Sequence, residues 1–416
     1  MSLFNSKLFS IPRESWLGFS SSFSEAYNMS LFVFMAPILA PLLFKDSVQE
    51  NSVFLTYMLI FLGSFVMYPL GAWYYGHIGD AKGRRAACIS SSFGLAVVTG
   101  AIAFLPINIL SNYTWIFFFI LLSLQFFFSA GEYYSSIVFS LEHGSTENQG
   151  FMSGISCFFA VLGLLLANGL SILSVTFETI ISWRAVFIVG LLTGLLSLGF
   201  KFYCKESPIF NLKNEFKSIS FDFIKENFPI IFSITFVTGF FHSIYAYTFI
   251  FLPLIYSDSA TSNSQLETFF CLIVYGVGLL ITGYFSDKYK IKSTMCFGLI
   301  AFLCFIFIFI SFFHSMPFII RLLLTLCACI YIGPIHSWVV EQSHPNKRCR
   351  ITAISTAFAI GIFFNACVPI CLFFYQKYAS LWLSSIYIAV LAIIALFILL
   401  KSKTSVCLSN ECGIRQ

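Results

Sequence analysis

Long apolar runs separated by short polar gaps constrain this chain more than any other feature of its sequence. A helix needs about 20 apolar residues to cross the hydrocarbon core of a bilayer, and the runs reach that length. The chain is 58% hydrophobic and 10% charged, with a mean hydropathy of +0.89, so a soluble fold could not bury its apolar surface. A membrane β-barrel would show short alternating segments instead. The pattern predicts an all-α integral membrane protein.

The apolar runs fall into two sets on either side of a polar stretch that carries both signs of charge. The first set predicts membrane helices at 17–44, 53–78, 86–106, 114–141, 151–175 and 184–203. The second set predicts them at 228–255, 266–285, 294–313, 317–340, 351–375 and 380–400. We therefore expect an N-terminal six-helix half at 1–204, a cytoplasmic linker at 205–227, a C-terminal six-helix half at 228–401 and a short cytoplasmic tail at 402–416.

The positions of Lys and Arg predict the orientation of these helices, because cytoplasmic loops are enriched in both residues. If the N-terminus is cytoplasmic, nineteen of the 23 basic residues fall on the inside. The remaining four are Lys45, Arg184, Arg321 and Lys377. We expect a multi-pass protein of a bacterial-type inner membrane with both termini cytoplasmic. The net charge of +5 is scattered, which argues against nucleic-acid binding.

The polar residues do not form a pattern typical of catalysis or metal binding. Most of the 13 cysteines lie inside apolar runs, where a cysteine usually acts as a small buried hydrophobe. We find no ligand spacing for a metal, no catalytic triad and no phosphate-binding loop. The sequence predicts that the protein is not an enzyme and needs no metal or other cofactor.

A short motif occurs once in each predicted half. Gly76 is followed four residues later by Asp80, and Gly283 is followed four residues later by Asp287. The two aspartates are 207 residues apart and occupy the same inter-helix loop of each half, as in transporters built from two parallel repeats. The candidate gating motif consists of Gly76, Asp80, Gly83, Arg84, Arg85 and Asp287. Gly83 has no glycine counterpart in the second half, where Lys290 stands in its place.

These residues resemble a known family. Tyr68-Pro69-Leu70-Gly71 and the loop from Gly76 to Arg85 resemble the signature of the major facilitator superfamily. Together with Gly131-Glu132-Tyr133 and Gly333-Pro334, they are similar to its metabolite:proton symporter family, which includes proline/betaine, α-ketoglutarate, citrate and shikimate transporters. The resemblance implies twelve helices in two pseudo-symmetric halves and alternating access to a central cavity lined mainly by helices one, four, seven and ten. It also implies that the Asp80 loop holds the cytoplasmic side closed in the outward-facing state.

The chain departs from this family pattern at three polar positions. Tyr68 and Leu122 stand where the family usually has Arg, and Asn28 stands where helix one usually has an acid. These departures leave two alternatives to proton-coupled symport of a proline/betaine-like zwitterion or a small carboxylate. One is an uncoupled facilitator or exchanger, and the other is a membrane sensor that has lost transport.

Two acids within the predicted spans, Glu25 and Glu132, are candidate proton carriers, because burying a charge in a membrane costs free energy unless it is neutralised. The proton-coupling or substrate set is Glu25, Glu132, Asn28, Tyr27, Gln125 and Tyr133. The substrate-cavity candidates, which lie near helix breakers in helices seven and ten, are His242, Tyr245, Tyr247, His336 and Trp338. The expected partners of the protein, which we expect to be a monomer, are a small-molecule substrate, protons and the lipid bilayer.

Overall fold

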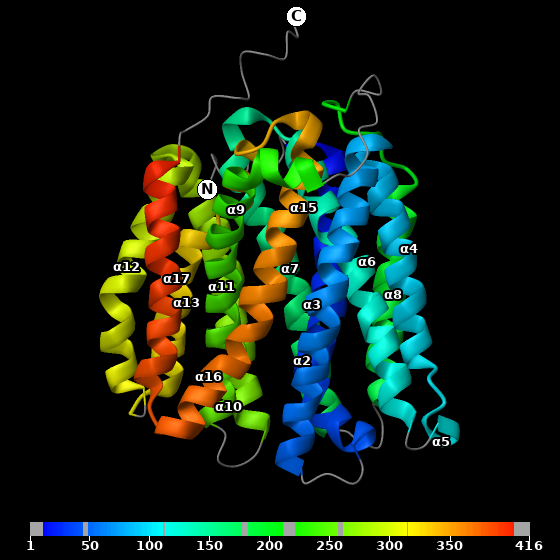
Figure 1. Cartoon of the computed structure of the whole chain (residues 1–416), viewed down its shortest axis with the longest axis vertical. Coiled ribbons are helices and arrows are strands. Elements are labelled where there is room, and N and C mark those ends of the chain that lie inside the picture. The colour runs from blue at the N-terminus through cyan, green and yellow to red at the C-terminus, as the bar shows by residue number, and fades with distance from the viewer. Residues whose placement is uncertain are drawn as a thin grey trace, which may run out of the picture.

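The computed structural model is a bundle of long, roughly parallel helices (Figure 1). It describes residues 11–44, 49–110, 113–176, 182–210, 221–256, 261–313 and 315–402. Within these ranges there is no strand. Parts of the predicted linker and tail, at 211–220 and 403–416, lie outside the described residues, as does Lys45.

The helices of the first half follow the predicted spans closely. They are α2 (Arg13–Leu43), α3 (Gln49–Ala81), α4 (Arg84–Ala103), α5 (Ile107–Leu110), α6 (Thr114–His143), η2 (Thr146–Asn148), α7 (Gln149–Thr176) and α8 (Trp183–Lys201). The short elements α5 and η2 lie in connections between long helices. Local hydrophobic runs therefore set the positions of these helices.

Three spans of the second half are broken, and α9 begins earlier than the predicted residue 228. The elements are α9 (Phe221–Ala246), η3 (Tyr247–Phe251), α10 (Leu252–Tyr256), α11 (Thr261–Tyr289), α12 (Ile291–Phe312), α13 (Pro317–Ile332), α14 (Ile335–Glu341), η4 (Pro345–Lys347), α15 (Arg348–Phe358), η5 (Ala359–Phe364), α16 (Asn365–Tyr378) and α17 (Leu381–Lys401). Both η3 and η5 are π-helical. The break after α13 occurs at Gly333-Pro334, where proline cannot donate a backbone hydrogen bond.

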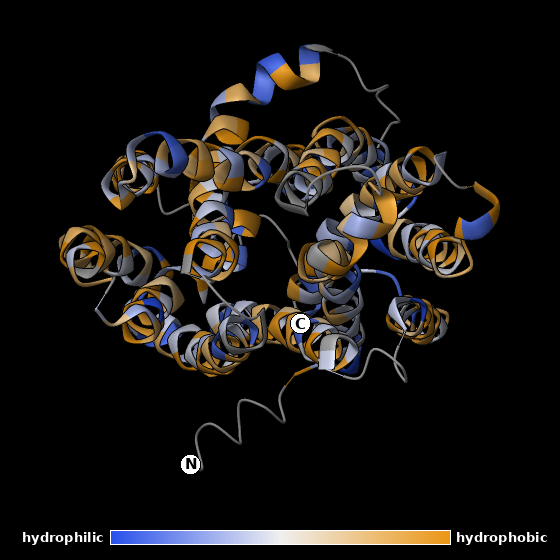
Figure 2. Cartoon of the chain, turned by 90° about the horizontal axis from the view of Figure 1, so that it is seen from below, coloured by the Kyte–Doolittle hydropathy of each residue, from blue (hydrophilic) through white to orange (hydrophobic). Residues whose placement is uncertain are grey.

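The described chain contains 11 helices that are long and apolar enough to cross a membrane. The 31-residue α2 is not among them, but it packs in the bundle against α3, α6, α7 and α8 as a twelfth long helix. Seen along their axes, the helices surround the centre of the molecule (Figure 2). Large apolar side chains such as Phe93, Leu196, Phe297 and Phe397 are exposed on the outside, as lipid contact requires. The chain is a multi-pass membrane protein with the expected two-half, twelve-helix arrangement.

The two halves meet closely at two equivalent helix crossings. Where α7 crosses α11, a Cβ on Gly154 would lie 2.6 Å from the carbonyl oxygen of Leu279 and 3.1 Å from Cα of Gly283. Where α3 crosses α15, a Cβ on Gly76 would lie 3.1 Å from Cα of Arg350. Small residues allow helix backbones to approach in this way in membrane proteins. The glycines of the repeated motif therefore form the contact between the halves.

The turns that follow the two motifs share a backbone conformation despite their different residues. Gly83 precedes α4 with φ of 107°, and Lys290 precedes α12 with φ of 71°. A positive φ is uncommon for a residue other than glycine. Lys290 is thus the structural counterpart of Gly83, although the sequence comparison of the halves found no glycine there.

A close contact within the first half gives a test of the packing. Gly71 of α3 faces α6, and a Cβ at this position would clash with the backbone carbonyl of Phe127. We expect Gly71→Ala to push the two helices apart and to cost about 1–3 kcal/mol of stability, as overpacking usually does. The measurement is the thermal unfolding temperature of the purified protein in detergent.

Gly199→Ala is the matched control, because a Cβ on Gly199 of α8 would meet nothing within 4 Å. This variant should unfold at the wild-type temperature or slightly above it, since alanine favours a helix more than glycine does. Equal unfolding temperatures for the Gly71 and Gly199 variants would contradict the close packing of α3 on α6.

Candidate functional site

A cavity with about 1030 Å³ of empty space lies between the two halves. Its walls come from α2, α3, α6 and α7 of the first half and from α9, α11, α14, η5 and α16 of the second. Pockets for small molecules are usually lined mostly by apolar side chains, with a few polar groups that orient the ligand. The lining of this cavity has this character and therefore suits a small metabolite.

Glu25 is the one acidic side chain among the described residues that line the cavity, and none of them is Lys or Arg. It is 5% exposed, and its Oε1 accepts a hydrogen bond from the Ser129 hydroxyl at 2.6 Å. The aromatic lining residues are Tyr68, Phe126, Tyr133, Phe241, Tyr245, Tyr275 and Phe364. The cavity thus combines one carboxyl group with many ring faces, which attract cationic groups.

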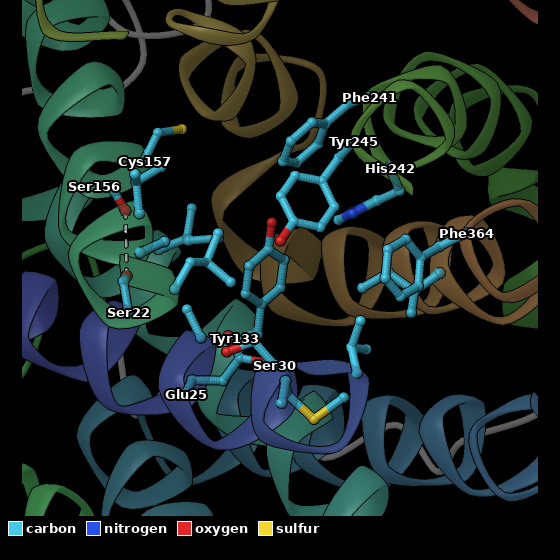
Figure 3. Close-up of a pocket in the computed structure, with 18 of the residues that line it drawn as sticks. Ser22, Glu25, Ser30, Tyr133, Ser156, Cys157, Phe241, His242, Tyr245 and Phe364 are labelled. Carbon is cyan, nitrogen blue, oxygen red and sulfur yellow. Dashed lines mark hydrogen bonds between the residues drawn. The ribbon is translucent and has the colours of Figure 1, made fainter. Parts of the chain in front are cut away.

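Two histidines of the second half border the same cavity. His242 comes from α9, and His336 comes from the first turn of α14. The ring of Tyr133, from α6, lies 6.2 Å from the ring of His242 and 6.0 Å from that of His336, measured between centroids. Figure 3 shows Glu25 on one wall, His242 and Tyr245 on the other, and Tyr133 between them.

Five of the residues proposed from the sequence line this cavity: Glu25, Tyr133, His242, Tyr245 and His336. Tyr27 and Asn28 do not line it, because their side chains turn toward other helices of the first half. The Tyr27 hydroxyl donates to the carbonyl of Val186 at 2.7 Å, and Asn28 Oδ1 accepts from Thr99 at 3.0 Å. Both residues bind neighbouring helices, and their role in coupling or substrate binding stays a prediction.

Gln125, Tyr247 and Trp338 also lie outside the cavity lining, contrary to expectation. Gln125 donates to the backbone carbonyl of Asn28 at 3.2 Å. The Tyr247 hydroxyl lies 2.9 Å from the Ser385 hydroxyl. Trp338 is buried on the short α14, and the cavity is bordered from this helix by His336 instead. The helix breakers indicated the correct helices but not which face of each helix lines the cavity.

Glu132 is fully buried but points into the interior of the first half. Its Oε1 lies 2.6 Å from Nζ of Lys201, and Ser92 bonds both groups. Glu132 therefore does not line the cavity beside Glu25, and its role in proton coupling stays a prediction. From the sequence, Lys201 is one of the basic residues expected on the cytoplasmic side. The spacing of residues within α8 could not show that the amino group of Lys201 pairs with a carboxylate on α6.

At the end of the bundle that carries the α3–α4 turn, both motif aspartates bind the opposite half. Asp80 accepts from the backbone N–H groups of Cys349 and Arg350 at 3.1 and 3.0 Å. Asp287 accepts from those of Gly150 and Phe151 at 2.7 and 3.2 Å. Each carboxylate thereby caps the first turn of a helix of the other half, where unpaired N–H groups favour an anion. We call this end of the molecule the charged end.

Glu142 of α6 connects further charges at the charged end. It lies 3.1 Å from Arg84 Nε of its own half and 2.8 Å from Arg348 Nη1 of the second half. Arg84 also donates to the carbonyl of Pro345 at 2.7 Å. The motif arginines therefore help to join the halves, while Arg85 binds carbonyl groups of Lys201 and Phe202 within the first half.

The chain that leaves α8 is tied into the same region. The Glu206 carboxylate accepts from the backbone N–H groups of Arg84 and Arg85 at 2.9 and 3.2 Å, and the Ser207 hydroxyl donates to Glu142. The turn at Gly83 brings the start of α4 within reach of Glu206. The beginning of the predicted linker is thus part of the first half.

The cavity continues as two smaller hollows on the side of the molecule away from the charged end. One shares Val33, Ile60, Phe364 and Asn365 with the cavity, and the other is lined by Val33 and by Pro253 of α10. Figure 1 places α10 at the end of the bundle opposite the α3–α4 turn. The described structure therefore joins the halves at the charged end and leaves hollow space between them toward the other.

Comparison with known proteins agrees with this architecture. No family model matches the chain. It is 25% identical over 198 residues to the proline/betaine transporter of Escherichia coli, and 26% identical over 279 residues to a putative proline/betaine transporter of Staphylococcus aureus. These matches cover 45% and 62% of the chain, and 38% and 58% of the two relatives. The chain thus spans less than two thirds of the length of these relatives.

The solved structure of the major facilitator superfamily proton:xylose symporter XylE covers 95% of the chain, with a TM-score of 0.72 and 15% sequence identity. At this identity the likeness establishes the fold alone. The two-half bundle, the repeated aspartate motif and these similarities lead to one conclusion. The chain has the major facilitator fold and is related in sequence to bacterial proline/betaine transporters.

Proposed function

We propose that the protein is a secondary transporter that carries a small zwitterion together with a proton through the cavity between its halves. The observation that carries this proposal is a central cavity with a single described acid, Glu25, and with neither Lys nor Arg in its lining. The sequence similarity to proline/betaine transporters supports the same substrate class. The two bodies that move are the N-terminal half, together with the segment around Glu206 and Ser207 that is bound to it, and the C-terminal half.

Electrostatics gives a reason for symport. A zwitterion brings its own carboxylate into a small cavity that already holds Glu25. Two unit charges about 8 Å apart at an effective dielectric constant of about 20 repel by roughly 2 kcal/mol, or about 30-fold in affinity. In this proposal the aromatic rings, and not Glu25, hold the ammonium group. Protonation of Glu25 then removes the repulsion between the two carboxylates, so the proton and the substrate favour each other's binding. This reciprocity is what symport requires.

Small carboxylates that carry no positive group are disfavoured as substrates. An anion without a positive group would have no cationic partner among the described lining residues. Burial of an unpaired charge costs several kcal/mol. A zwitterion can instead place its ammonium group against the rings of the cavity.

The charged end is the cytoplasmic end in this proposal, as the distribution of Lys and Arg predicts. The inter-half contacts of Asp80, Asp287 and Glu142 support closure on that side. The described conformation is then the outward-facing one. Release of the substrate to the cytoplasm requires these contacts to break.

A second candidate is an exchanger of an organic cation for a proton, which Glu25 and the aromatic walls also favour. Here a cation would bind the deprotonated carboxylate, so acidification would weaken binding. For a zwitterionic substrate, acidification should strengthen it. The sign of the pH dependence of affinity therefore separates the two candidates.

The first prediction from this proposed function concerns Glu25→Gln, which mimics the protonated carboxyl group. We expect betaine to bind this variant with an affinity that no longer depends on pH, whereas the wild-type affinity should be higher at pH 6 than at pH 8. Accumulation of labelled betaine in proteoliposomes under an imposed proton gradient should be lost. Exchange of betaine in the absence of a gradient should persist.

Glu147→Gln is the control, because Glu147 is exposed in η2 and does not line the cavity. It should accumulate betaine as the wild type does. Full proton-driven accumulation by the Glu25 variant would remove Glu25 from coupling, and tighter binding at high pH would favour the exchanger.

A second prediction separates a structural role of Glu132 from a proton-carrying role. Glu132→Gln leaves the buried Lys201 amino group without its carboxylate, so we expect lower stability and reduced uptake. The double variant Glu132→Gln/Lys201→Met removes both charges and should recover stability together with proton-driven uptake. Recovery of stability without proton-driven uptake would show that Glu132 itself carries the proton.

A third prediction tests closure of the charged end. Asp80→Asn removes the charge that pairs with Arg350 at 3.2 Å and weakens the cap on α15. Cys349, which is 2% exposed in this crossing, should then react faster with a maleimide, by about tenfold for a loss of about 1.4 kcal/mol. Mass spectrometry of the Cys349 peptide gives the rate. Glu147→Gln should leave it unchanged, and an unchanged rate in Asp80→Asn would contradict the gating role.

A further inference from the structure

Two histidines, His242 and His336, are among the polar side chains that the second half contributes to the cavity lining. His242 is 8% exposed, and its Nε2 has no hydrogen-bond partner in the described structure. His336 is 7% exposed and borders the same space. A buried polar atom without a hydrogen-bond partner costs about 1–3 kcal/mol of free energy. A bound ligand that forms a hydrogen bond to this atom removes that cost.

The backbone around His336 is fixed by a contact between the halves. Ser153 of α7 donates to the carbonyl of Gly333 at 2.7 Å and accepts from the N–H of His336 at 3.1 Å. The Gly333-Pro334 break leaves these backbone groups available, and Ser153 satisfies them. The direction of the His336 side chain is thus set by the helix break rather than left to a flexible loop.

We propose that His242 and His336 form the subsite for the carboxylate group of the zwitterionic substrate, an inference that rests on the proposed function. A neutral imidazole carries one N–H donor, and its tautomer is set by its partners. The carboxylate accepts from these rings, and Glu25 lies on the opposite wall, where its like charge is farther away (Figure 3). The ammonium group then contacts the aromatic rings of the lining, including Tyr133, Tyr245 and Phe364.

This arrangement makes the substrate bridge the two halves. Its carboxylate binds α9 and α14 of the second half, and its ammonium group contacts the ring of Tyr133 from the first half. A ligand without the carboxylate loses the hydrogen bonds to His242 and His336 of the second half. The histidines therefore determine the preference for a zwitterion over the corresponding cation.

Glycine betaine and choline test this proposal, because both carry a trimethylammonium group and only betaine carries a carboxylate. The measurement is the ratio of their dissociation constants for purified full-length protein at one fixed pH. We expect His242→Leu and His336→Leu each to lower the preference for betaine over choline by about tenfold, as loss of a hydrogen bond to a charged group usually does. His242→Gln keeps an amide donor and should retain most of the preference.

The outcomes distinguish this inference from the function on which it rests. Wild-type protein that binds neither ligand would overturn both the subsite and the proposed substrate class. Wild-type protein that prefers betaine, with an unchanged ratio in both leucine variants, would overturn the subsite alone. A leucine variant that fails to fold is recognised by its unfolding temperature, and His242→Ala and His336→Ala then decide the question, because an unchanged ratio in both alanine variants would overturn the subsite.

Discussion

A charge inside a membrane protein must be neutralised, and this constraint organises most of the polar contacts described above. Placing one ionised side chain at the centre of a bilayer costs about 2.5–3.5 kcal/mol by insertion scales. Lys201 is accordingly paired with Glu132, Arg348 with Glu142, and Arg321 with Glu267 at 3.3 Å. Glu25 differs, because it accepts a hydrogen bond from the hydroxyl of Ser129 and faces the cavity. The charge of Glu25 can therefore be compensated by a proton or by a bound ligand.

The positions of the spanning helices could be predicted because they depend on local sequence. Twenty apolar residues in a row leave the backbone few alternatives in lipid. The repeated motif likewise predicted equivalent contacts in the two halves, and the caps made by Asp80 and Asp287 agree with it. Lys290 has a positive φ, as Gly83 does. The two halves therefore share this backbone turn, although the residues at the two positions differ.

The partners of the polar residues could not be predicted, because they lie on helices far apart in sequence. The location of Glu25 and Glu132 within predicted spans made both candidate proton carriers, but a position within a span does not give the direction in which a side chain points. Glu132 and Lys201 are 69 residues apart, and Glu142 and Arg348 are 206 apart. Asn28 likewise accepts a hydrogen bond from Thr99 and does not line the cavity. In each of these cases, the rotation of the helix about its own axis determines where the side chain points, and tertiary packing sets that rotation.

The attachment of Glu206 and Ser207 to the start of α4 and to Glu142 has a consequence for dividing the gene into two fragments. A fragment that ends at residue 204 would lack the carboxylate that caps α4 and the hydroxyl that binds Glu142. A fragment that continues through Phe210 would keep both. Co-expressed half-molecules should therefore assemble best when the chain is divided beyond Phe210, so that the connecting segment remains with the half that it helps to hold together.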